Sequence, residues 1–154
     1  MSRAFVKESD DAEADLLPEL VVSPHRNFVT PAGLALIEAT VERLQAALSE
    51  ARAVDDRTAV ARVQRDLRYW TDRRRTAEVV PPPGENDVVR FGSTVLLEHG
   101  DGTRARYQVV GEDEADPAAG KVSYVSPIAR ALLGAAAGDV VALVNGEAEI
   151  LEIR

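Results

Sequence analysis

The chain has 154 residues and a formal net charge of −8, so it can form one ordinary domain or two small units. The acidic balance argues against broad affinity for nucleic acid, because neutralising phosphates requires a basic surface. The absence of cysteine excludes disulfides and thiolate metal sites. No apolar run approaches the roughly 18 residues of a membrane-spanning helix, and residues 1–20 are acidic where a signal peptide is basic and then apolar. We therefore expect a cytoplasmic protein with no membrane partner.

The charge is distributed unevenly along the chain. Residues 1–30 carry a net charge of −3, residues 31–80 carry +1 and residues 81–154 carry −6. Residues 1–29 combine an acidic cluster with two prolines and show little hydrophobic periodicity. Such a composition buries little apolar surface, so we expect residues 1–29 to form a flexible, acidic N-terminal segment.

Residues 30–80 have the hydrophobic spacing of two helices. Apolar residues recur at alternating steps of three and four at Leu34, Ile37, Val41, Leu44, Leu48 and Ala51, and again at Val60, Val63, Leu67 and Trp70. Thr30 followed by Pro31 is typical of a helix start, because the hydroxyl caps the first amides and the ring already holds helical φ. The pattern predicts helices over Pro31–Ala53 and Arg57–Glu78. Their short connection predicts an antiparallel coiled-coil hairpin.

Arginines gather on the second predicted helix, whereas glutamates decorate the first. Opposite charges on neighbouring helices fix their pairing and register, which accounts for some of these arginines. Consecutive residues lie about 100° apart around a helix, so Arg73, Arg74 and Arg75 cannot all face the partner helix. We expect these three residues to form a basic patch that faces outward.

Prolines end the second helix and separate it from a part with strand-like periodicity. We expect a proline-rich linker over residues 81–86 and a domain over residues 87–154. The expected strands are Val88–Glu98, Arg104–Gly111, Lys121–Val125, Val140–Val144 and Ala148–Ile153, with a short helix at Pro127–Leu133. The predicted fold class is therefore α+β, a helical hairpin followed by a small, mostly-β domain with one short helix.

Three stretches of the second part resemble a known family. The second part resembles the C-terminal domain of the Gre-type (GreA/GreB) transcript cleavage factors of bacterial RNA polymerase. The resemblance lies in the segments VRFGSTV and YQVVGEDEADPAAGKVSYVSPIARALLG and in the pair Gly138-Asp139. The order of hairpin and domain is also that of the family, so the resemblance covers residues 30–154. It implies an FKBP-like fold for the C-terminal domain, which docks at the rim of the polymerase secondary channel while the coiled coil enters the channel.

The resemblance also implies a role for the hairpin tip. In the family, an acidic tip helps to hold a catalytic magnesium ion and a water that hydrolyses backtracked RNA, which makes Asp55 and Asp56 the candidate catalytic and metal-binding residues. The chemistry is suitable, because Mg²⁺ takes oxygen ligands and often only one or two protein carboxylates. We expect no cofactor in the isolated chain, and Mg²⁺ to be shared with RNA polymerase if cleavage occurs.

Two features of the hairpin depart from the cleavage factors. Their tips carry an Asp-x-x-Glu pair, whereas the residue three positions after Asp55 is Thr58. Both arms are also shorter, by two to three turns of about 5.4 Å each, or on the order of 10–15 Å of reach. An alternative for the acidic pair is structural, because either Asp55 or Asp56 can cap the second helix.

The resemblance also implies contacts of the C-terminal domain and of the arginines. The acidic loop 112–116 and the short helix that begins after Ser126 match the family's docking region. The candidate docking residues are Asp113, Glu114, Ser126, Pro127 and Arg130. The patch at Arg73, Arg74 and Arg75 is the candidate for contact with RNA phosphate or with acidic groups of the polymerase.

These observations predict a transcription elongation factor that binds RNA polymerase and contacts nascent RNA. It would modulate elongation and would at most stimulate the polymerase's own hydrolysis of backtracked RNA. An alternative is a secondary-channel binder without cleavage activity. A prolyl isomerase is a remote alternative, because its active site needs an aromatic-lined apolar pocket and this domain offers only Phe91, Tyr107 and Tyr124. We expect a monomer; a dimerising coiled-coil protein is the remaining alternative.

Overall fold

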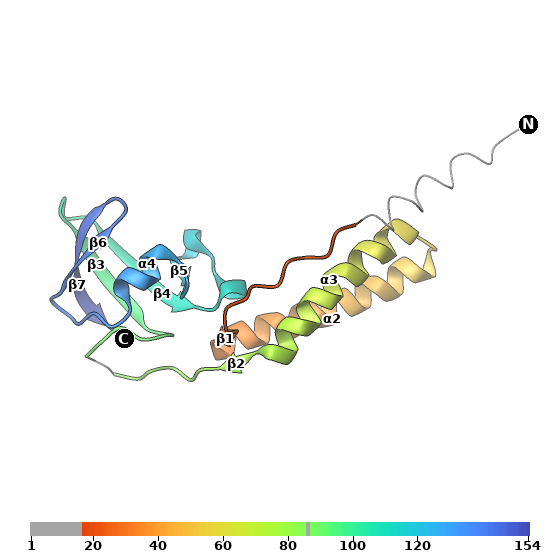
Figure 1. Ribbon diagram of the computed structural model, residues 1–154, viewed down its shortest axis with the longest axis horizontal. Coiled ribbons are helices and arrows are strands. Elements are labelled where there is room, and N and C mark those ends of the chain that lie inside the picture. Colours follow the sequence, from red (N-terminus) through yellow and green to blue (C-terminus); the bar gives the residue numbers. More distant parts are fainter. Residues whose placement is uncertain (1–16, 86) are drawn as a thin grey trace, which may run out of the picture. The chain divides into compact units, whose positions relative to one another are not determined.

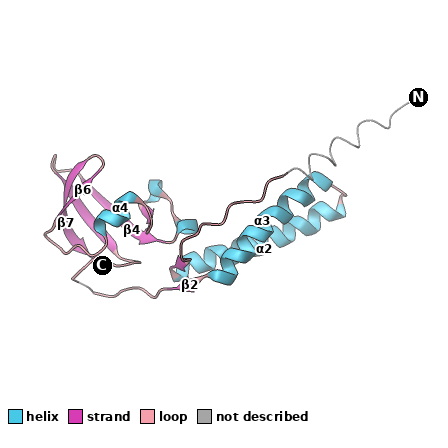
Figure 2. Ribbon diagram, in the orientation of Figure 1, coloured by secondary structure: helices cyan, strands magenta, loops and turns pink. Residues whose placement is uncertain are grey.

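The computed structural model describes residues 17–85 and 87–154, so most of the predicted flexible segment lies outside the described residues. The described chain divides into two compact units. One contains residues 17–25 and 35–76, and the other contains residues 26–34 and 77–154. The two long helices belong to the N-terminal half of the chain and most of the strands to the C-terminal half (Figures 1 and 2).

The helical hairpin consists of α2 (Pro31–Ala53) and α3 (Arg57–Thr76). Helix α2 begins as predicted, because the Thr30 hydroxyl accepts a hydrogen bond of 2.9 Å from the amide of Gly33 and so caps the first turn. Four residues of the predicted apolar stripe on α2 are buried, namely Ile37, Val41, Leu44 and Ala51. The matching stripe on α3 is half-buried along its length.

Helix α3 ends at Thr76, two residues earlier than predicted, because the chain after it forms a strand. Strand β2 (Glu78–Val79) pairs in parallel with β1 (Phe28–Val29), which the sequence pattern did not predict. The amide of Glu78 donates to the carbonyl of Asn27 at 2.8 Å, and the amide of Val80 donates to that of Val29 at 2.9 Å. These amides therefore donate hydrogen bonds to the β1 segment instead of forming another turn of helix α3.

A five-stranded sheet forms most of the second unit, in the order β5-β4-β3-β7-β6. Its strands are β3 (Thr94–His99), β4 (Arg104–Val110), β5 (Lys121–Ser123), β6 (Val140–Leu143) and β7 (Gly146–Ile153). Neighbouring strands are antiparallel, except that β4 and β5 are parallel. Strand β3 begins later than the predicted strand Val88–Glu98. Gly92 adopts φ 87° and its amide donates to the carbonyl of Val109, which breaks the extended run before Thr94.

The core of the second unit lies between the sheet and α4 (Pro127–Leu132). Val95, Leu97 and Ile150 from the strands and Ala129 and Leu132 from α4 are buried. Short 3₁₀ turns at Glu112–Glu114 and Pro117–Ala119 connect β4 to β5. The predicted α+β class is confirmed, with a helical hairpin followed by a small, mostly-β domain. None of the helices in the described part of the chain is long and apolar enough to cross a membrane.

Candidate functional site: the hairpin tip and its flanking surfaces

The tip of the hairpin consists of the three residues between α2 and α3. Asp55 has φ 53° and is the one non-glycine residue with positive φ among those the structure describes. Its amide donates a hydrogen bond of 3.2 Å to the carbonyl of Arg52, and the amide of Asp56 donates one of 3.0 Å to the carbonyl of Ala51. This pair of bonds is a Schellman termination of α2, with Asp55 in the left-handed position that is usually glycine. The backbone of the tip is therefore fixed by hydrogen bonds.

Asp56 starts the second helix. Its carboxylate Oδ1 accepts a hydrogen bond of 3.0 Å from the amide of Ala59, and its carbonyl accepts one of 2.9 Å from Val60. Asp56 is thus the N-cap of α3, as the structural alternative predicts for one member of the pair. Asp55 makes no hydrogen bond or ion pair through its side chain with any residue in the described ranges. Both aspartates are exposed, so the apex presents one capping carboxylate and one that is uncommitted.

The capping role of Asp56 leads to a stability prediction. We expect Asp56→Ala to lower the free energy of unfolding by about 1 kcal/mol, because the first turn of α3 loses an acceptor for its amide. Asp56→Asn should stay close to the wild type, since asparagine caps as well as aspartate. Urea unfolding followed by circular dichroism measures both. Equal losses in the two variants would show that charge, and not capping, is what matters at this position.

The tip has the right donor chemistry for Mg²⁺ but an incomplete set of ligands. The described residues contain no group of three or more His, Cys, Asp or Glu side chains that could hold a metal ion. Two carboxylates are the most that the tip can provide, and one oxygen of Asp56 already accepts the Ala59 amide. The residues therefore fit Mg²⁺ only where a partner supplies the other ligands.

The structure corrects the predicted basic patch. Arg73 is 1% exposed and cannot belong to an outward-facing surface, whereas Arg74 and Arg75 are exposed. Arg73 follows Trp70 by three residues and so continues the stripe of α3 by one position beyond its last apolar residue. Arg75 pairs with Asp72 at 2.5 Å. The outward basic surface near the end of α3 therefore consists of two arginines rather than three.

The structure also corrects the role of Glu114. Its side chain is buried, and Oε2 accepts a hydrogen bond of 2.5 Å from the Thr30 hydroxyl. Its Oε1 lies 3.6 Å from Nζ of Lys121. A Cβ at position 33 would lie 2.7 Å from Oε2, so Gly33 leaves the space that this carboxylate occupies. Glu114 is therefore a buried hydrogen-bond partner at the start of α2 and is not accessible to a docking partner. Gly33, in the first turn of α2, is the sequence signal that could have indicated this buried position.

The other predicted docking residues lie on or near α4. Ser126 caps the helix by accepting a hydrogen bond of 3.3 Å from the amide of Ala129, while Pro127 and Arg130 are exposed. A groove of about 180 Å³ lies between the first turn of α4 and the end of β6, beside Val144, which is 98% exposed. Asp113 is half-buried in the preceding loop. Pro127, Arg130 and the groove are therefore the accessible part of the predicted docking region.

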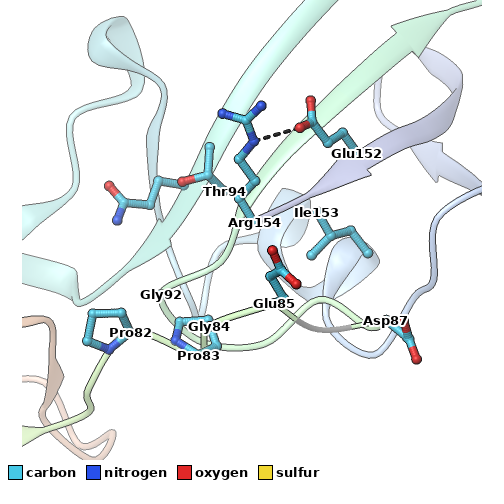
Figure 3. Close-up of a pocket in the computed structure, with 11 residues that line it drawn as sticks. Pro82, Pro83, Gly84, Glu85, Asp87, Gly92, Thr94, Glu152, Ile153 and Arg154 are labelled. Atoms are coloured by element: carbon cyan, nitrogen blue, oxygen red, sulfur yellow. Dashed lines mark hydrogen bonds and ion pairs between the residues drawn. The ribbon is translucent and has the colours of Figure 1, made fainter.

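Two other features of the second unit bear on a small-molecule site. Phe91 and Tyr124 pack against Phe28 of β1, with ring centroids 6.0 and 5.5 Å from that of Phe28, so these aromatics fill space rather than line the pocket that a prolyl isomerase needs. A larger hollow of about 1090 Å³ lies between the linker and the sheet (Figure 3). In it, Arg154 and Glu152 pair with each other at 2.6 Å, and the hollow contains none of the predicted site residues.

The fold and the site define a two-part protein, in which a helical hairpin with an acidic tip precedes a small, mostly-β domain. The family model "Transcription elongation factor, GreA/GreB, C-term" matches residues 84–154. GreA of Ralstonia nicotianae is 35% identical over 151 residues, which cover 82% of this chain and 94% of that protein. GreA of Phenylobacterium zucineum is 40% identical over 116 residues, covering 66% and 74%. The chain belongs to the GreA/GreB family of transcription elongation factors.

The chain is also similar to two further proteins. GreB of Neisseria meningitidis serogroup A is 41% identical over 98 residues, and the match spans 60% of each chain. Among solved structures, GreA factor homolog 1 (Gfh1) of Thermus thermophilus is 27% identical; the match covers 84% of this chain and 99% of that one, with a TM-score of 0.42.

Proposed function

We propose that this chain binds RNA polymerase at its secondary channel and modulates transcript elongation through the tip of its hairpin. Membership of the GreA/GreB family supports the partner. The observation that carries the proposal is the tip itself, where hydrogen bonds at both helix ends fix the backbone and leave the Asp55 carboxylate exposed at the apex. A rigid rod with a charged end is suited to placing that charge at a distance from where the protein docks.

The accessible face of the C-terminal domain supports the docking part of the proposal. Pro127 and Arg130 are exposed on one short helix, beside the groove of about 180 Å³ and the exposed Val144. A helix that carries an exposed arginine and borders an apolar groove fits a partner that presents a carboxylate and an apolar side chain. In the proposed complex the chain acts as a monomer, and Arg74 and Arg75 contact nascent RNA or the polymerase.

Stimulated hydrolysis of backtracked RNA is a second candidate, favoured by the adjacency of Asp55 and Asp56 at the apex. In that case both carboxylates would hold a Mg²⁺ ion that the polymerase also ligates, and such an ion lowers the pKa of a bound water so that it becomes a nucleophile. The capping bond of Asp56 and the missing Asp-x-x-Glu spacing weigh against this candidate. Channel binding without cleavage needs neither feature.

One experiment tests both candidates. Stalled, backtracked elongation complexes of the cognate polymerase are mixed with the wild type or with the Asp55→Asn/Asp56→Asn variant, and RNA shortening and binding are both measured. Asparagine tolerates the left-handed conformation at position 55 and caps a helix at position 56, so this variant removes the charges without fraying the tip. Glu42→Gln, an exposed charge change within α2, is the matched control.

The outcomes separate the candidates. If the wild type binds and leaves the RNA intact, the chain is a channel binder without cleavage activity. If the wild type shortens the RNA and only the double variant fails while still binding, the tip takes part in hydrolysis. If the wild type does not bind the polymerase, the proposed function is wrong.

A further inference from the structure

The segment that precedes the hairpin lies against α3. Residues 17–25 are extended and run beside α3 in Figure 1. The guanidinium of Arg68 donates to both carboxylate oxygens of Glu19, through Nε at 3.0 Å to Oε2 and through Nη2 to Oε1. Such a two-bonded pair fixes the orientation of both groups. We call residues 17–25 the strap.

Charge complementarity explains why the strap lies on this helix. The strap contains one acidic residue, Glu19, and no lysine or arginine. Helix α3 holds seven arginines and two aspartates, a net charge of +5. The hydrogen bonds from Arg68 hold the pKa of Glu19 below its ordinary value, and the same bonds raise the pKa of Arg68. The strap therefore places the Glu19 carboxylate on Arg68, where an external polyanion would otherwise bind.

The C-terminal end of the strap is fixed. Arg26, the next residue, pairs with Glu78 at 2.5 Å, and its guanidinium lies 4.6 Å from the ring centre of Phe28. The hydroxyl of Tyr124 donates to the carbonyl of Arg26. Beyond this anchor the strap is only lightly held, because Leu20, Val21 and Val22 are 40%, 90% and 40% exposed. A segment that is fixed at its C-terminal end and held on α3 by an exposed ion pair can leave this surface without unfolding the hairpin.

We propose that the strap is a built-in competitor that screens the arginine surface of α3 and is displaced when single-stranded RNA binds there. The surface suits RNA better than an acidic protein, because the residue next to the exposed Arg68 is Tyr69, an aromatic side chain that is only partly buried. Arginine guanidinium groups bind phosphates and aromatic rings stack on bases, so the surface can contact both the backbone and the bases of a single-stranded RNA. This inference rests on the proposed function for its biological setting, but its test does not require polymerase.

The first measurement is RNA affinity by fluorescence anisotropy, using a labelled 12-nucleotide single-stranded RNA and the full-length chain. At roughly 50 mM salt, Glu19→Gln is expected to bind about two- to fivefold more tightly than the wild type. The slope of log K against log salt should steepen by about 0.7, the value for one additional phosphate contact on a single strand. Glu147→Gln, an exposed change of equal charge in the other unit, controls for net charge and should show neither effect.

The second measurement reports the position of the strap directly. Because the chain contains no cysteine, Val21→Cys and Thr71→Cys provide two unique labelling sites, both exposed. The distance between spin labels at these sites should be short and narrowly distributed in the unliganded chain. It should lengthen and broaden when the RNA is added, and Glu19→Gln should broaden it without RNA.

The proposal is overturned if Glu19→Gln and Glu147→Gln have the same RNA affinity and salt slope, if neither protein binds the RNA, or if RNA leaves the label distance unchanged. A gain in affinity for polyglutamate without a gain for RNA would identify an acidic protein as the partner and would also overturn it. Polymerase binding is measured in parallel with the same proteins. If the wild type does not bind polymerase, the proposed function is wrong, but the RNA-affinity and spin-label results can still be interpreted.

Discussion

Gly111→Ala is expected to lower the free energy of unfolding by about 2–3 kcal/mol, a large effect for the addition of one methyl group. Gly111 is buried at the end of β4, and its φ of −71° is one that any residue adopts, so strain in its own backbone is not the cause. A Cβ at this position would lie 2.4 Å from the carbonyl oxygen of Phe28. That neighbour is backbone and cannot rotate away, so the segment containing β1 must move as a unit.

Movement of β1 would have further costs. The ring of Phe28 packs edge-to-face on Tyr124, with centroids 5.5 Å apart, and lies tilted against Phe91, with centroids 6.0 Å apart; β1 also carries the hydrogen bonds to β2. Gly100→Ala is the matched control, because no atom lies within 4 Å of its added Cβ and its φ is not positive. Urea unfolding of both variants tests the prediction. A Gly111→Ala protein as stable as Gly100→Ala would mean that β1 does not press on this glycine in solution.

The sequence predicted the elements whose signals are local. Helix α2 has the predicted bounds. Both of its signals, the Thr-Pro start and the apolar residues at 3-4 spacing, lie within the sequence of the helix itself and do not depend on distant segments. The last two strands, predicted at Val140–Val144 and Ala148–Ile153, and the short helix after Ser126 were placed within one or two residues for the same reason. Capping of α3 by an aspartate was also foreseen as the structural alternative for the tip.

Features that depend on distant segments could not be predicted in this way. The β1–β2 pairing joins two-residue strands fifty residues apart, which is too short a length for any periodicity. The bond from Thr30 to Glu114 joins residues 84 positions apart. Its consequence is the correction with the greatest bearing on function, because a carboxylate expected on the surface is instead buried at the start of a helix. The left-handed conformation of Asp55 was missed because aspartate tolerates that conformation without requiring it.

The arginine run at the end of α3 gives the second large prediction. Arg73→Ala is expected to cost about 2–4 kcal/mol, in the range of large-to-small changes at buried sites, because the side chain is 1% exposed and its removal leaves a buried gap. Arg74→Ala, one residue further on and exposed, should change the free energy of unfolding by no more than about 0.5 kcal/mol.

This pair also separates stability from binding. If the outward surface of α3 contacts RNA or polymerase, Arg74→Ala should weaken binding while leaving unfolding unchanged, whereas Arg73→Ala should destabilise the hairpin first. The measurements are urea unfolding and polymerase binding of both variants at a temperature where each remains folded. If Arg73→Ala were as stable as Arg74→Ala and bound more weakly, Arg73 would lie on the outward basic surface after all. The continuation of the apolar stripe beyond Trp70 would then have to be abandoned.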